Sequence, residues 1–88
     1  MVFAVEITPE GLRHLNRLPD KIRSAVLATI FDSIAENPQR VGKPLRGELE
    51  GLYCARRGEF RVIYEIDEDA RVVLIHRAQH RRSVYRKR

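Results

Sequence analysis

The stretch ARRGEFRVIYEI at residues 55–66 decides the fold more than any other part of this sequence. From Glu59 onward its side chains alternate between two faces: Phe60, Val62, Tyr64 and Ile66 on one, and Arg61, Ile63 and Glu65 on the other. Such an alternation of β-branched and aromatic residues is typical of a strand. Gly58 stands where a tight turn would reverse the chain. The stretch therefore predicts a β-hairpin whose strands cover residues 52–57 and 59–66.

A third strand is expected over residues 71–78. Its pattern places Val72, Leu74 and His76 opposite Val73, Ile75 and Arg77. The connection at residues 67–70 is short enough for a second hairpin, but it contains neither Gly nor Asn, so the sequence leaves its turn type open. Three consecutive strands joined in this way would pair antiparallel.

The N-terminal half predicts a strand and then two helices. Residues 3–7 are short and apolar, as in a strand, and Thr8-Pro9 is a helix start signal. One helix would run to about Leu18. A second would cover residues 20–36, because apolar residues recur every four positions, at Ile22, Val26, Ile30 and Ile34, with Leu27 and Phe31 beside them. Residues 37–51, rich in Gly and Pro, read as a loop.

The element order is therefore β-α-α-β-β-β, an α+β fold in which a helical hairpin packs on a mostly antiparallel sheet. With 88 residues and 10.3 kDa, the chain has room for one domain, residues 1–88. No apolar run is long enough for a membrane span, the N-terminus lacks the pattern of a signal peptide, and Cys54 has no disulfide partner in the chain. These features predict a cytoplasmic protein that does not bind a membrane.

Positive charge is concentrated at the C-terminal end. The chain holds 17 Lys and Arg against 12 Asp and Glu, and residues 77–88 contain six basic residues and no acidic one. Residues 1–76 then sum to −1, with 11 basic and 12 acidic residues. A cationic end on a nearly neutral body favours a polyanionic partner, and arginine binds phosphate through two hydrogen bonds. The alternative is a solvated tail that only aids solubility.

Two groups of residues suggest phosphate chemistry. Arg56 and Arg61 lie on adjacent strands of the predicted hairpin, where they would form a cationic sheet face unless Arg61 pairs with Glu65 instead. The segment HRRSVY at residues 80–85 combines a histidine, two arginines and a tyrosine. RNA cleavage by the adjacent 2′-hydroxyl needs proton transfer and cations for the phosphorane, which we assign to His80 or Tyr85 and to the arginines. Alternatively, Tyr85 stacks on a base, or residues 84–85 only pack the C-terminus.

The sequence contains no recognisable metal, cofactor or nucleotide motif. His76, His80 and Cys54 are the nearest approach to a zinc site, but neither CxxC nor HExxH is present. Cys54 has no evident activator and is interpreted as a small inert side chain. We therefore expect no metal and no cofactor.

The chain resembles the RelE branch of the RelE/ParE toxin superfamily over nearly its whole length. The resemblance rests on KPLRG at residues 43–47, on LEGLY at 49–53, on the block at 55–66 and on HRRSVY at 80–85. It implies a small RNase-like fold and a ribosome-dependent mRNA endoribonuclease of a type II toxin–antitoxin system. The implied partners are mRNA in the ribosomal A site, the ribosome and a cognate RelB-like antitoxin, which would form a hetero-oligomer with the toxin.

Carried over by position, the family's hairpin arginine is Arg61 and its C-terminal tyrosine is Tyr85. Two positions where well-studied members have lysines hold Cys54 and Arg56, and the arginine after the last strand falls on His80 or Arg81. The expected catalytic set is Arg56, Arg61, His80, Arg81 and Tyr85. The expected RNA-binding set is Lys43, Arg46, Arg57, Arg77, Arg82 and Arg86. A DNA gyrase inhibitor, as in the ParE branch, and a non-catalytic rRNA-binding module are the alternatives.

Overall fold

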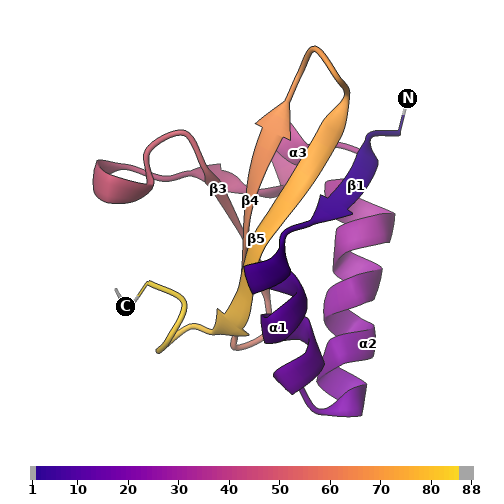
Figure 1. Cartoon of the computed structure of the whole chain (residues 1–88), viewed down its shortest axis with the longest axis vertical. Coiled ribbons are helices and arrows are strands. Elements are labelled where there is room, and N and C mark those ends of the chain that lie inside the picture. Colours follow the sequence, from indigo (N-terminus) through magenta and orange to yellow (C-terminus); the bar gives the residue numbers. More distant parts are fainter. Residues whose placement is uncertain (1, 86–88) are drawn as a thin grey trace.

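The computed structural model describes residues 2–85 and contains one five-stranded sheet with helices on one of its faces (Figure 1). The strands are β1 (Ala4–Ile7), β2 (Lys43–Pro44), β3 (Tyr53–Arg57), β4 (Phe60–Asp67) and β5 (Val72–His80). The helices are α1 (Pro9–Arg17), α2 (Asp20–Thr29), the π-helical turn η1 (Ile30–Ile34), α3 (Pro38–Val41) and the 3-10 turn η2 (Gly47–Leu49). None of the helices within residues 2–85 is long and apolar enough to cross a membrane.

The strands are ordered β1-β5-β4-β3-β2. The β3–β4 and β4–β5 pairs are antiparallel, as the two predicted hairpins require, and β1 pairs parallel with β5. A parallel neighbour needs a crossover, and here α1 and α2 provide it within one layer beside the sheet. The predicted α+β fold, with a helical hairpin on a mostly antiparallel sheet, is confirmed.

The first helix begins as its sequence predicts and lies unusually close to the sheet. The Thr8 side chain accepts a hydrogen bond from the Gly11 backbone N–H at 3.0 Å, and Pro9 occupies the first turn. A Cβ atom at Gly11 would lie 2.5 Å from the Ile75 carbonyl oxygen, so only glycine allows this approach to β5. One turn later, His14 Nδ1 accepts a hydrogen bond from the Ala78 N–H at 3.2 Å. These contacts fix α1 against β5.

The second helix departs from the single regular helix predicted over residues 20–36. After Thr29 the backbone changes to a π-helical turn, in which the Ala35 N–H donates to the Ile30 carbonyl at 2.9 Å. The π-helical turn adds one residue to this part of the helix. Ile30 and Ile34 of the predicted stripe are fully buried, whereas Phe31, predicted beside them, is 51% exposed. A regular 3.6-residue repeat cannot reveal such an insertion, because the insertion shifts every later residue around the helix axis.

Residues 37–51, predicted as a loop, contain the short elements α3, β2 and η2. Tyr64 explains how the first of these is held, because its buried hydroxyl donates to the Pro38 carbonyl at 2.6 Å. Gly42 passes directly over the same ring, and a Cβ there would lie 2.2 Å from the Tyr64 oxygen. Tertiary contacts with β4 therefore order a segment whose composition alone suggests no structure.

A β-bulge changes the predicted alternation along β5. The register pairs Ile63 with Arg77 but Tyr64 with Ile75, so His76 is an extra residue on β5. Val73, Ile75 and Ala78 are all buried in the core, whereas strict alternation had placed Arg77 on their face. That prediction was wrong because a bulge reverses the face of every residue that follows it. The bulge thereby moves Arg77 to the sheet face away from the helices.

Candidate active site

The register assigns the predicted site residues to two opposite faces of the sheet. Ala55, Val62 and Ala78 form one cross-strand row, and all three lie in the core cluster with residues of α1 and α2. Their neighbours along each strand therefore face away from the helices. We call this outward side the cationic face, and define it by two rows of aligned residues: Lys43, Cys54, Ile63 and Arg77, then Arg56, Arg61 and Gln79.

Arg56 and Arg61 stand directly opposite one another on β3 and β4. Two like charges at such a position destabilise a sheet unless an anion lies between them. Backbone carbonyls at the β3–β4 turn partly fix Arg61, since its Nη1 donates to Gly58 at 2.9 Å and to Phe60 at 3.0 Å. Arg56 is exposed. The predicted alternative, an Arg61–Glu65 pair, is not formed, because Glu65 instead contacts His76 Nε2 at 3.0 Å.

Tyr85 brings a hydroxyl to the same two arginines from the C-terminal segment. Its hydroxyl donates to Cys54 Sγ at 3.2 Å, although half of the residue is exposed. Burial of the hydroxyl and the bond to the Cys54 thiol raise the pKa of Tyr85 to about 12, and the positive charges of Arg61 and Arg56 act in the opposite direction. The phenol is therefore protonated at neutral pH and is a hydrogen-bond donor beside two cations.

The structure does not bring every predicted catalytic residue to this face. His80 pairs with Phe60 across the strands, on the side of the helices, and its ring packs edge-on against Phe60 at 5.4 Å. Its Nδ1 accepts a hydrogen bond from the Arg82 N–H at 3.1 Å. Arg81 lies at the end of the β3–β4 turn, where its Nε contacts Glu59 Oε1 at 2.7 Å. Both partners of this ion pair are more than half exposed, so a phosphate can displace the carboxylate at little cost.

The predicted RNA-binding residues are also divided. Lys43 lies in the same row as Cys54, and Arg46 follows β2 as an exposed side chain. Arg57 is on the opposite face, where it lines an apolar hollow together with Lys21, Ile22 and Phe60. Arg82 is exposed in the turn after β5, and Arg86 lies outside the described residues.

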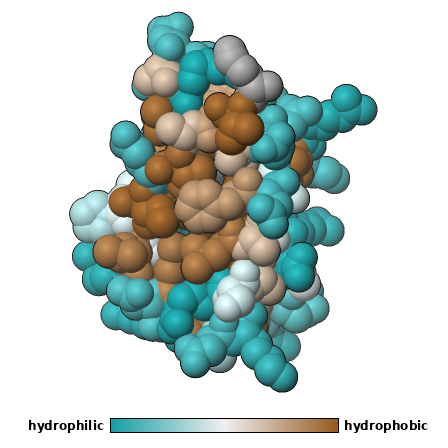
Figure 2. All heavy atoms as spheres, turned by 90° about the vertical axis from the view of Figure 1, so that its right-hand side faces the viewer, coloured by the Kyte–Doolittle hydropathy of each residue, from teal (hydrophilic) through white to brown (hydrophobic). Residues whose placement is uncertain are grey.

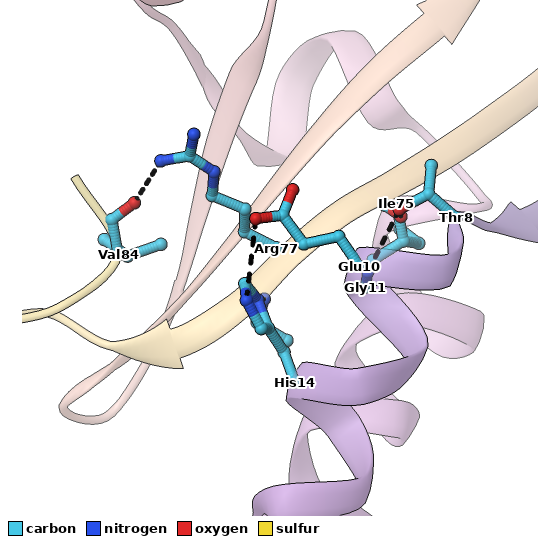
Figure 3. A network of polar contacts seen from close by, with 8 residues as sticks. Thr8, Glu10, Gly11, His14, Ile75, Arg77 and Val84 are labelled. Atoms are coloured by element: carbon cyan, nitrogen blue, oxygen red, sulfur yellow. Dashed lines mark hydrogen bonds and ion pairs between the residues drawn. The ribbon is translucent and has the colours of Figure 1, made fainter. Parts of the chain in front are cut away.

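Arg77 has a contact that the sequence did not suggest. Its Nη1 donates to the Val84 carbonyl at 2.7 Å, so this guanidinium holds the C-terminal segment (Figure 3). Sequence reasoning also missed Gln79 as a member of this face, and it interpreted Cys54 as inert although the family resemblance places Cys54 at a site position. The strand register is the signal that finds them, because it aligns Cys54 with Lys43 and Gln79 with Arg61. Among residues 2–85, no three His, Cys, Asp or Glu side chains are grouped to hold a metal ion.

Comparison with known proteins decides the family. Residues 5–85 match the family model described as ParE toxin of type II toxin–antitoxin system, parDE. The chain is 42% identical over 87 residues to Toxin RelG of Mycobacterium tuberculosis, covering 99% of this chain and 100% of RelG. This chain belongs to the RelE/ParE family of type II toxin–antitoxin toxins. It is also 48% identical over 82 residues to Toxin RelE of the same organism, covering 92% of this chain and 84% of that toxin.

Solved structures agree with this RelE/ParE assignment. The toxin–antitoxin complex RelBE2 of M. tuberculosis contains a chain with 41% identity and a TM-score of 0.87, over 91% of this chain and 99% of that one. The intact RelBE complex of Escherichia coli matches with a TM-score of 0.76 over 89% of this chain and 95% of its own, but at 16% identity it supports only the fold. The predicted resemblance to RelE-like toxins is thus confirmed.

Proposed function

We propose that this RelE/ParE toxin is an endoribonuclease that cleaves mRNA on the ribosome, and that the cationic face binds the scissile phosphate. The opposed pair Arg56 and Arg61, with the Tyr85 hydroxyl bound to Cys54 in the neighbouring row of the same face, carries the proposal. A phosphodiester placed there would supply the negative charge that two facing arginines require. Lys43 and Arg46 extend the positive charge along one side and would guide the RNA backbone.

The reaction is transesterification by the neighbouring ribose. The 2′-oxygen bonds to phosphorus as the bond to the 5′-oxygen breaks, which leaves a 2′,3′-cyclic phosphate and a 5′-hydroxyl. The 2′-hydroxyl releases its proton to solvent, and the leaving 5′-oxygen takes up another. Arg56 and Arg61 stabilise the charge that develops on the phosphorane oxygens. Guanidinium groups suit this role because they cannot be deprotonated in proteins and so stay charged throughout the reaction.

Tyr85 is the proposed donor to the leaving 5′-oxygen. Its pKa of about 12 keeps the hydroxyl protonated at working pH, so it is a donor and not a base. His80 is expected to contribute little to this step, because it lies on the other side of the sheet. The described residues of the cationic face offer no strong base, and we infer that alignment of the mRNA by the ribosome lowers much of the barrier.

The test compares Arg61→Ala and Arg56→Ala with Arg13→Ala, an exposed arginine on α1 that is remote from the cationic face. Purified toxin is added to ribosomes with and without bound mRNA, and the RNA ends are mapped. We expect cleavage of ribosome-bound mRNA by the wild type and by Arg13→Ala, and a loss of about 100-fold or more in each of the other two variants. Equal cleavage by all four proteins would contradict the proposal.

The cleavage assay, combined with a gyrase supercoiling assay and a ribosome-binding assay, separates the two alternative functions. Intact mRNA together with impaired supercoiling by purified gyrase would indicate a gyrase inhibitor. Salt-sensitive binding to ribosomes without any cleavage product would indicate an rRNA-binding module. Neither alternative is favoured by a particular contact in the structure, whereas the Tyr85 hydroxyl beside Arg56 and Arg61 favours phosphate chemistry.

We also infer that a RelB-like antitoxin binds this toxin. Figure 2 shows apolar side chains gathered on the side of the molecule where β1 and α2 lie in Figure 1. Val2, which precedes β1, is 58% exposed, and Phe31 of η1 is 51% exposed, and such a patch on a small protein commonly marks a partner site. An amphipathic antitoxin helix matches this surface, and an acidic segment of the same antitoxin would neutralise the cationic face.

A further inference from the structure

The C-terminal segment, residues 81–85, lies against the cationic face without forming a strand. β5 ends at His80, whose carbonyl accepts from the N–H groups of Ser83 at 2.8 Å and Val84 at 3.1 Å. This turn leads the chain back over the sheet, where Val84 is fully buried. Within residues 2–85, no backbone hydrogen bond joins residue 84 or 85 to a neighbouring strand. Side chains must therefore hold these two residues in place.

Two side-chain contacts, from two different strands, do so. Arg77 of β5 donates to the Val84 carbonyl at 2.7 Å, and Cys54 of β3 accepts from the Tyr85 hydroxyl at 3.2 Å. Both residues belong to one cross-strand row, with Ile63 of β4 between them. Ile63 is fully buried although it faces away from the helices and lies outside the main core cluster. Residues 84–85 therefore span this row and cover Ile63.

We propose that Arg77 and Cys54 are positioning residues that clamp residues 84–85, Arg77 at the Val84 carbonyl and Cys54 at the Tyr85 side chain, and so hold the Tyr85 hydroxyl on the cationic face near Arg56 and Arg61. This inference rests on the proposed nuclease function and deepens it. It assigns Arg77 to the protein's own backbone instead of to RNA, and it gives the Cys54 thiol a defined acceptor role. The β5 bulge is what makes the clamp possible, because it moves Arg77 to this face.

The electrostatic setting of Tyr85 agrees with a held hydroxyl. Burial and the Cys54 contact raise its pKa, while the positive charges of Arg61 and Arg56 lower it, so the hydroxyl is influenced by both the thiol and the guanidinium pair. A tyrosine released from the sheet would lose all of these influences and return toward its ordinary pKa of 10. The ionisation of Tyr85 therefore reports on the clamp independently of catalysis.

The first test uses neutral replacements of Arg77. Arg77→Gln keeps an N–H donor for the Val84 carbonyl and removes the charge, whereas Arg77→Met removes both. We expect cleavage of ribosome-bound mRNA to fall by no more than about threefold in Arg77→Gln and by about tenfold or more in Arg77→Met. Equal losses in both variants would show that Arg77 acts through its charge on the phosphate, and would overturn its positioning role.

The second test treats the other end of the clamp in the same way. Cys54→Ser keeps an acceptor for the Tyr85 hydroxyl, and Cys54→Ala removes it. We expect Cys54→Ser to retain cleavage within about threefold of the wild type, and Cys54→Ala to lose clearly more. If both variants cleave like the wild type, the Cys54 contact has no positioning role. Arg13→Gln is the matched control for surface mutation.

The third measurement does not depend on cleavage. With tyrosine labelled by ¹³C at Cζ, and with Tyr85→Phe used for assignment, the ionisation of Tyr85 is followed up to about pH 11. We expect Tyr85 to stay mostly protonated in the wild type and Arg77→Gln, and to ionise near its ordinary pKa in Arg77→Met. Unchanged ionisation in Arg77→Met would refute the clamp. A wild type that holds Tyr85 but cleaves no mRNA would instead refute the proposed function.

Discussion

At the scale of single residues, Tyr64 shows how one side chain can organise two segments. Its ring is fully buried and stacks on Tyr53 with centroids 5.7 Å apart, and its hydroxyl binds the Pro38 carbonyl. Desolvation by burial is the main reason that the pKa of Tyr64 rises to about 12, against the lowering effect of a hydrogen bond with the Gly42 backbone. Folding therefore favours the neutral form of the Tyr64 phenol over the ionised form.

Because the pKa of Tyr64 is higher in the folded protein than in the unfolded chain, its contribution to stability is present below pH 10 and declines as pH rises toward about 12. We expect the free energy of unfolding to fall over this range, by up to about 2–3 kcal/mol from Tyr64. Urea unfolding at a series of pH values measures the effect. Tyr64→Phe should be destabilised by about 1–2 kcal/mol at neutral pH and should decline less steeply. An equally steep decline in that variant would contradict the assignment.

At the scale of elements, the contact between α1 and β5 depends on the absence of a side chain at Gly11. Helix propensity alone favours alanine over glycine in a helix by about 1 kcal/mol. The structure predicts that alanine at position 11 destabilises the protein instead, because its methyl group would collide with the Ile75 carbonyl oxygen. The helix must then move away from the sheet, and with it His14, which binds the Ala78 N–H beside the bulge.

We therefore expect Gly11→Ala to destabilise the protein by about 1–3 kcal/mol, as overpacking does elsewhere. Chemical denaturation followed by circular dichroism measures the change. Ser24→Ala, an exposed position within α2, is the control and should be neutral or slightly stabilising. A gain in stability for Gly11→Ala would mean that α1 does not pack on β5 as closely as described.

At the scale of the molecule, charge is divided along the outward face of the sheet. Arg56, Arg61 and Lys43 lie at one end, while Glu6, Glu65 and Asp67 line a shallow pocket at the other. A polyanion is attracted to the first end and repelled by the second, so this division of charge would orient the RNA that we propose as substrate. Apolar side chains gather on the side of β1 and α2, which suits the protein partner proposed above (Figure 2).

We expect Phe31→Ser to weaken antitoxin binding by about tenfold or more, because large exposed aromatic side chains dominate such interfaces. Isothermal titration with the proposed RelB-like antitoxin measures the affinity. The stability of the free toxin should change little, since half of the Phe31 side chain is already in solvent. Asp32→Asn is the neighbouring control, and an unchanged affinity for Phe31→Ser would place the antitoxin on another surface.

The amino-acid sequence determined the elements whose signals are local. Thr8-Pro9 set the start of α1, the alternation at residues 59–66 set β4, and Gly58 set the turn before it, because caps, turns and side-chain periodicity depend on neighbouring residues only. Arg56 and Arg61 were likewise predicted on adjacent strands of one hairpin, and the register places them directly opposite one another.

Only the tertiary structure decided the rest. The bulge in β5 and the π-helical turn each insert one residue, and an insertion changes the facing of all later residues without leaving a periodic signal. As a result of the bulge, Arg77 holds the Val84 carbonyl and His80 lies away from the arginine pair. The exposure of Phe31 also differs from the sequence prediction. The Tyr85–Cys54 contact joins residues 31 positions apart, and it forms because packing across three strands brings them together.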